Sequence, residues 1–179
     1  MRIIVSILLL TSLFSACKEA NHPTVFNYID VSVSNSWTGK LSVNVDSSKV
    51  VHIMIDSLNK GKTNYTGTIN DSVFQILNHL VKKAVTRNHR EIQGVPVPDG
   101  GVSGIEIIAK NKKIQTLLFN SHEDNILDSL ITQLTILNNY KLSKEKNSNF
   151  YFPSYDIITP KMEHVDFVAP IVKEDTIIK

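Results

Sequence analysis

Between residues 28 and 69, apolar and polar residues alternate at every second position, and this feature restricts the fold more than any other. A period of two is typical of strands that bury one face. Turn-forming residues divide the stretch into strands at about residues 28–34, 41–45, 51–55 and 63–69. The short connections between them predict an antiparallel meander.

The spacing of apolar residues changes to that of a helix after Asn70. Asn70 is a suitable N-cap residue, and Lys82 and Lys83 near the end of the segment complement the helix dipole. We expect Leu77 and Leu80 to pack against the sheet. The apolar positions of this predicted helix are Val73, Ile76, Leu77, Leu80, Val81, Ala84 and Val85.

A second hairpin and a second helix are predicted farther along the chain. Residues 105–109 can pair with residues 114–118 across a lysine-rich turn. The following helix is expected to begin after Ser121 and to stop at Asn138–Asn139. One apolar stripe on each helix and one apolar sheet face predict an α+β fold. We expect an antiparallel sheet of about five or six strands (meander, helix, hairpin, helix) with two helices on one face.

The first seventeen residues have the pattern of a secretory signal peptide. Arg2 precedes an apolar run from Ile3 to Phe14, and the small residues Ser15 and Ala16 lead to Cys17, the only cysteine. The apolar run is shorter than the roughly 20 residues that a membrane-spanning helix needs. Two alternatives are an ordinary signal that is cut elsewhere and a buried N-terminal helix.

The end of this segment resembles the lipobox of bacterial lipoproteins, which is of the Leu-Ser-Ala-Cys kind. Phe14 stands where leucine is usual, with Leu13 beside it. The resemblance implies that Cys17 carries a lipid anchor with palmitate-type acyl chains, and that residues 1–16 are removed. More than one acyl chain gives stable anchoring. In such lipoproteins an aspartate after the cysteine signals inner-membrane retention; Lys18 here implies the outer membrane, facing the periplasm or the surface.

These patterns divide the chain into four regions. We expect a signal peptide at 1–16, a lipidated cysteine and tether at 17–24, an α+β domain at 25–140 and an extended C-terminal arm at 141–179, with an edge strand near Tyr155–Thr159. The layout of 25–140 resembles small lipoproteins of the Bacteroidota type, a family that offers no assigned active site.

Composition and motifs argue against several functions. A formal net charge of +2 does not suit a dedicated nucleic-acid binder. After Cys17 no cysteine remains for a disulfide or a cysteine zinc site, and we expect no cofactor. The segment His122-Glu123-Asp124 lacks the second histidine of a zinc-protease helix. The glycines of 94–104 precede a strand instead of the helix that a phosphate loop requires. We therefore expect no enzyme.

One surface is a candidate for binding. Arg87, His89 and Arg90 form a basic cluster at the end of the first helix, before a proline- and glycine-rich loop that contains Asp99. The alternative is a solvated helix end that satisfies its dipole. Trp37, in a predicted turn, either presents an aromatic contact or folds back on the sheet.

The sequence thus predicts a membrane-anchored envelope lipoprotein with a non-catalytic binding domain and an envelope protein as partner. Two alternatives remain open. One is an inhibitor or immunity-type protein on the envelope, and the other is an enzyme with a dispersed site near the 87–104 loop.

Overall fold

The structure is a computed structural model, and it describes residues 24–35, 39–96, 100–120, 124–145 and 148–163. The predicted signal peptide, with Cys17, lies outside the described residues, as does nearly all of the predicted tether. In the described part of the chain, no helix is long and apolar enough to cross a membrane.

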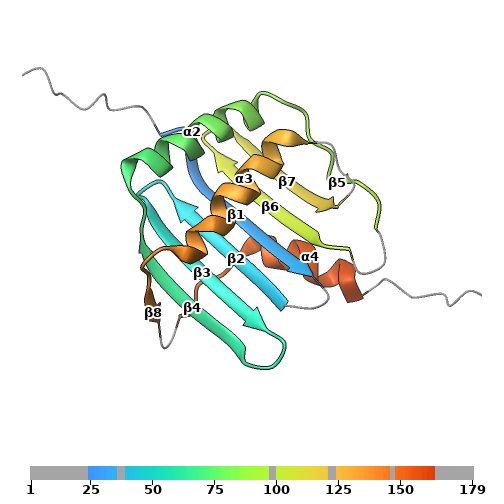
Figure 1. Cartoon of the computed structure of the whole chain (residues 1–179). Helices are drawn as coiled ribbons and strands as arrows, with labels where there is room; N and C mark the ends of the chain where they lie inside the picture. The colour runs from blue at the N-terminus through green and yellow to red at the C-terminus, as the bar shows by residue number, and fades with distance from the viewer. Residues whose placement is uncertain (1–23, 36–38, 97–99, 121–123, 146–147, 164–179) are drawn as a thin grey trace, which may run out of the picture.

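The centre of the molecule is one eight-stranded sheet in the order β5-β7-β6-β1-β2-β3-β4-β8 (Figure 1). The first four strands form an antiparallel meander, and the β6–β7 hairpin joins the free side of β1. The strand bounds are β1 Phe26–Asn35, β2 Gly39–Asp46, β3 Val50–Ser57, β4 Gly61–Thr68, β5 Ile92–Gln93, β6 Val102–Ala109, β7 Lys112–Phe119 and β8 Ser143–Glu145.

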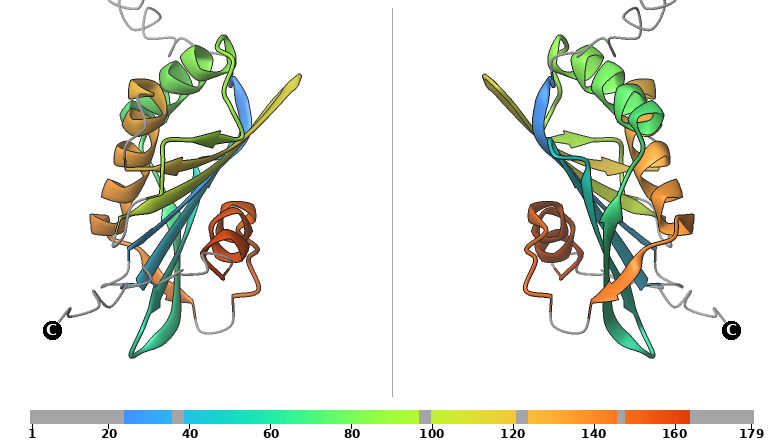
Figure 2. Two further views of the ribbon diagram at one scale, coloured as in Figure 1. Left: turned by 90° about the vertical axis from the view of Figure 1, so that its right-hand side faces the viewer. Right: turned by 90° about the vertical axis from the view of Figure 1, so that its left-hand side faces the viewer.

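In the described part of the chain, three α-helices pack on the sheet, and they lie on both of its faces (Figure 2). Helices α2 (Asp71–Val85) and α3 (Asn125–Ile136) lie side by side on one face, and α4 (Pro153–Glu163) lies on the other. A short 3-10 turn at Leu137–Asn139 follows α3.

The predicted fold class is therefore wrong in three respects. The sheet has eight strands instead of five or six, it is mixed because β5 runs parallel to β7, and a third helix covers its second face. The added strands β5 and β8 have two and three residues, too few for a period of two to be recognised in the sequence.

The C-terminal region also differs from the expected extended arm. Residues 143–145 pair with β4 as β8, and Tyr155–Thr159 belongs to α4 instead of an edge strand. Pro153 stands at the first position of α4, where proline is tolerated because its missing N–H would have no helical partner.

The main core lies between the sheet and the helices α2 and α3. The side chain of Asn70 accepts a hydrogen bond from the Val73 N–H and caps α2; Asp124 caps α3 in the same way. Leu77 is fully buried, whereas Leu80 is only partly buried, because Phe74, Leu77 and Val81 form the inner stripe of α2.

Candidate functional site

A row of polar residues crosses the sheet on the face that α4 covers. The strand registers place one member of the row on each of six neighbouring strands: Thr66, His52, Asn44, Asp30, Glu106 and Gln115. Asp30, Asn44 and Glu106 are almost completely buried. Because buried polar groups need partners, the contacts of these three decide what the face can do.

Asp30 connects β1 to the start of α4. One carboxylate oxygen accepts a hydrogen bond from the Ser154 backbone N–H at 2.8 Å, and the other accepts one from the Asn44 side chain at 2.9 Å. Burial raises the pKa of Asp30 to about 6, and the charge of Glu106 adds to this, although both hydrogen bonds oppose it. Both oxygens are occupied, so Asp30 positions the helix.

The first turn of α4 lies directly against the sheet. The Ser32 hydroxyl lies 2.6 Å from that of Ser42 and 2.7 Å from that of Ser154, inside the protein. A Cβ atom at Gly104 would lie only 2.7 Å from the Ser154 carbonyl oxygen. The glycine therefore allows the close approach of α4 to β6.

Glu106 holds two further groups at the edge of α4. Lys113 places its ammonium nitrogen 2.9 Å from one carboxylate oxygen, and the Tyr28 hydroxyl donates to the other. Burial and the Glu106 carboxylate raise the pKa of Tyr28 well above its ordinary value. The pair of carboxylates, Asp30 and Glu106, is thus fully engaged by neighbouring donors.

A cleft of about 660 Å³ opens beside these groups, and we call it the outer cleft. Residues of β1, β2, β6, β7 and α4 line it together with residues 150–151. Its walls include three aromatic rings, Tyr28, Phe150 and Tyr151, and the ion pair of Glu106 and Lys113. Such a combination of rings and a few convergent polar groups is typical of binding sites.

The aromatic wall of the outer cleft is built by stacking. Phe150 stacks on the His52 ring with centroids 4.0 Å apart and meets Phe152 edge-on at 4.9 Å. The exposed Tyr151 donates its hydroxyl to Asp156 at 2.6 Å, and this bond raises the Tyr151 pKa. The rings are therefore held in place before any ligand binds.

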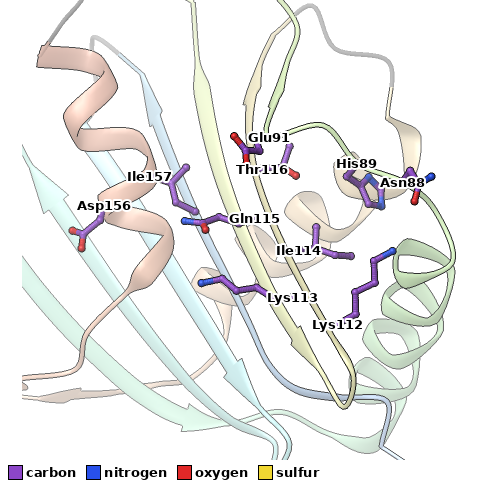
Figure 3. A pocket seen from close by; sticks show the side chains of 10 residues that line it. All are labelled: Asn88, His89, Glu91, Lys112, Lys113, Ile114, Gln115, Thr116, Asp156 and Ile157. Carbon is purple, nitrogen blue, oxygen red and sulfur yellow. The ribbon is translucent and has the colours of Figure 1, made fainter.

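A second hollow, of about 730 Å³, lies at the side of β7 that faces away from β6, and we call it the edge hollow (Figure 3). Asn88, His89 and Glu91 line it on one side, and it meets the outer cleft at Lys113 and Gln115. Figure 3 shows Lys113 and Gln115 directed toward α4. Thr116 is one of the residues that line this hollow, and its buried hydroxyl has no hydrogen-bond partner within the described ranges.

Of the residues predicted to form a binding surface, the structure places His89 away from solvent. Its Nδ1 lies 2.9 Å from an Asp124 carboxylate oxygen, and its Nε2 lies 2.8 Å from the Ala84 carbonyl oxygen. Both nitrogens are therefore engaged in joining the end of α2 to the start of α3. Arg87 and Arg90 have exposed side chains.

The remaining predicted site residues, Cys17, Trp37 and Asp99, lie outside the described residues. The dispersed site that was the alternative near the 87–104 loop brings His89 and Glu91 to the same hollow, but His89 has no free ring nitrogen there. Within the described ranges, no group of three or more His, Cys, Asp or Glu side chains is arranged to hold a metal ion.

Sequence reasoning missed the residues of the α4 face. Asp30 and Ser32 were visible as the polar positions of an alternating strand, which usually face water. Their burial depends on a helix more than 120 positions later, and no local pattern announces it.

No family model matches the sequence, and no curated protein matches it either. The assignment of a function therefore rests on the geometry of the chain itself.

Proposed function

We propose that this protein is a lipid-anchored, non-catalytic binding protein of a bacterial envelope, and that it recognises an envelope partner through the outer cleft. The observation that carries the binding role is the pre-formed aromatic wall of Phe150 and Tyr151 beside the ion pair of Glu106 and Lys113. Aromatic residues are enriched among the residues that dominate binding energies.

The state of the carboxylates supports a binding role over catalysis. General acid–base chemistry needs a carboxyl group within reach of a substrate. Asp30 is enclosed by Asn44 and Ser154, and Glu106 is held by Tyr28 and Lys113. These groups are suited to holding the cleft in shape.

The anchor in this proposal comes from the sequence of residues 1–17. Intact mass of the protein from a membrane fraction should show loss of residues 1–16 and a gain of acyl chains on Cys17. The Cys17→Ala variant should leave the membrane or accumulate as the uncut precursor. An unmodified thiol on a protein outside the membrane fraction would contradict the anchor.

The binding role is tested by photo-crosslinking in intact envelopes. A photoreactive phenylalanine analogue replaces Tyr151 in one variant and Lys82, exposed on α2, in a control variant. We expect one defined partner to crosslink from position 151 and not from position 82, and we expect Tyr151→Ala to weaken its binding about tenfold or more. Equal crosslinking from both positions would contradict the role of the outer cleft.

The basic side chains Arg87 and Arg90 form a second candidate contact, because both are exposed next to the edge hollow. Replacing both with Ser should weaken binding of an acidic partner most at low salt, since exposed charges are screened over about 8–10 Å near physiological ionic strength. Binding that is unchanged at every salt concentration would leave the arginines as a solvated helix end.

A further inference from the structure

We propose that the edge hollow takes an extended peptide segment of the partner, which adds a strand to the open side of β7. This inference rests on the proposed binding role and names the chemistry of the ligand. Strand addition is a recurring mode of peptide recognition in which main-chain hydrogen bonds supply affinity and alternate side chains supply specificity.

The direction of the β7 backbone groups is fixed by one hydrogen bond. The Leu117 N–H donates to the Glu91 carbonyl oxygen at 2.8 Å, on the side of β7 away from β6. Backbone groups alternate in direction along a strand. The N–H and C=O groups of Lys113 and Gln115 therefore point to the same side as those of Leu117.

These groups have no strand beside them in the part of the chain that the structure describes. On this side β7 pairs only through Leu117 and Leu118, with the two residues of β5. The register of β6 against β7 uses the other side along the whole strand. Among the described residues, no strand pairs with the two donors and two acceptors of Lys113 and Gln115 on this side.

The chain that precedes β5 is held at the ends of α2 and α3. His89 bonds there to Asp124 and to the Ala84 carbonyl oxygen, and the Lys112 ammonium at the start of β7 donates to the carbonyl oxygens of Val85 and Arg87. β5 begins only at Ile92, and the edge hollow fills the space between residues 88–91 and β7. A space of about 730 Å³ beside an unpaired strand has room for a short extended peptide.

The Thr116 hydroxyl adds a side-chain preference. The residue is 1 % exposed and lines the edge hollow, and its hydroxyl has no hydrogen-bond partner among the residues that the structure describes. A buried hydroxyl without a hydrogen bond is costly, so a ligand that supplies one is favoured. An added strand would direct every second side chain to this face of the sheet, and we infer that one of them is a hydrogen-bonding residue such as Ser, Thr or Asn.

The walls of the edge hollow argue against a second copy of this chain as the occupant. Asn88, His89 and Glu91 line one side of the space and β7 lines the other, so a single extended strand has room there. A second β7 would bring the β6 of its own copy with it, because the two strands pair along their whole length. A short peptide segment from a different protein carries no such second strand.

The probe for this test is a set of random heptapeptides selected on the full mature chain, followed by synthetic copies of those selected. Gln115→Pro removes one outward N–H and breaks no bond to β6, since proline is accepted on an edge with its nitrogen facing outward. Gln115→Ala keeps the N–H and is the matched control. We expect peptide binding to Gln115→Pro to be at least tenfold weaker than peptide binding to Gln115→Ala.

Amide exchange measured by NMR on the unaltered protein tests whether a peptide pairs with β7, even if Gln115→Pro folds poorly. The amides of Lys113 and Gln115 should exchange fast in the free protein and become protected on adding peptide. Those of Ile114 and Thr116 should be slow in both states. Thr116→Val should reduce affinity for peptides that carry the hydrogen-bonding residue and leave other peptides unaffected.

Three results would overturn the inference. They are an absence of enriched heptapeptides, peptides that bind Gln115→Pro as well as the original chain, and concentration-dependent dimers that protect Lys113 and Gln115 without peptide. If Tyr151→Ala abolishes binding of the crosslinked partner while Gln115→Pro does not, the outer cleft is the binding site. In that case the inference of strand addition is overturned and the proposed function stands.

Discussion

Asp30 and Ser154 are separated by 124 positions in the sequence, and the carboxylate of the first accepts a 2.8 Å hydrogen bond from the backbone N–H of the second. A negative charge is favourable at a helix N-terminus, where N–H groups lack helical partners. The bond fixes the start of α4 on the sheet. The outer cleft depends on it, because Tyr151 and Asp156 lie next to this start.

The titration of Asp30 should appear in the pH dependence of stability. Its pKa is raised from 3.8 to about 6, so the folded protein binds this proton more tightly than the unfolded chain. The stabilisation that this proton provides is therefore complete below pH 4 and is lost as the pH rises through 6. The change amounts to up to about 3 kcal/mol in the free energy of unfolding. Urea unfolding of the original protein and of Asp30→Asn at pH 4 to 7 measures the difference in slope. Parallel pH profiles would contradict this assignment.

A side chain at Gly104 should push α4 from the sheet. The added Cβ of Gly104→Ala would lie 2.7 Å from a backbone oxygen that has no freedom to rotate away. Overpacking of this kind costs typically 1–3 kcal/mol. Limited proteolysis should cut within residues 146–163 faster than in the original protein, whereas the neighbouring Ser103→Ala should behave like the original. Equal cleavage of both variants would show that α4 tolerates the shift.

The link between α2 and α3 through His89 should be important for stability. His89→Ala leaves the Asp124 carboxylate and the Ala84 carbonyl without their shared partner, at a cost of about 1–3 kcal/mol. Arg90→Ala, at an exposed position, should change stability by less than about 0.5 kcal/mol. Thermal unfolding of the two variants makes the comparison, and equal melting temperatures would contradict the structural role of His89.

The same variant should alter the response to acid. Burial acts to raise the Asp124 pKa, but the Leu127 N–H, the charge of His89 and the Ile126 N–H together lower it below its usual range. A lowered pKa stabilises the fold above the unfolded value and loses this stabilisation as pH falls through the folded value. We expect His89→Ala to lose less stability than the original protein between pH 5 and pH 3. An equal loss of stability between pH 5 and pH 3 in both proteins would show that His89 does not lower the Asp124 pKa.

The main core should respond strongly to Leu77 and weakly to its neighbour. Leu77 is 0 % exposed, so Leu77→Ala should cost about 2–5 kcal/mol. Ile76 is 46 % exposed and turns away from the sheet, so Ile76→Ala should cost far less. Chemical denaturation of both variants measures the two losses in the free energy of unfolding. Similar losses would mean that the inner stripe of α2 is wrongly assigned.

Local sequence patterns predicted the structure correctly where residues that are close in the sequence are also close in space. The alternation around Val31, Val43 and Ile53 identified strands that bury these residues completely. Asn70 was identified as the cap of α2, and its side chain accepts from Val73 three positions later. Such contacts form within a few residues, so the sequence alone carries them.

The predicted basic cluster is arranged differently in the structure, for a reason seen in His89. A histidine among arginines indicated a charged surface, but its ring contacts Asp124, 35 positions away, and is buried. The outer cleft combines residues of β1, β2, β6, β7 and α4 with residues 150–151, and none of its residues was expected to form a site. No motif marks a site assembled from segments that lie so far apart in the sequence.

The sequence by itself determined the meander, the hairpin, the helices α2 and α3 and the face on which those helices pack, because hydrophobic periodicity acts over a few residues and sets which side of an element is buried. Only the tertiary structure decided that the polar face would also be covered. The polar positions at Asp30 and Ser32 suit water as well as they suit the N-terminus of α4. Which of the two covers them depends on whether a distant segment can satisfy their hydrogen bonds, and local periodicity contains no information on that.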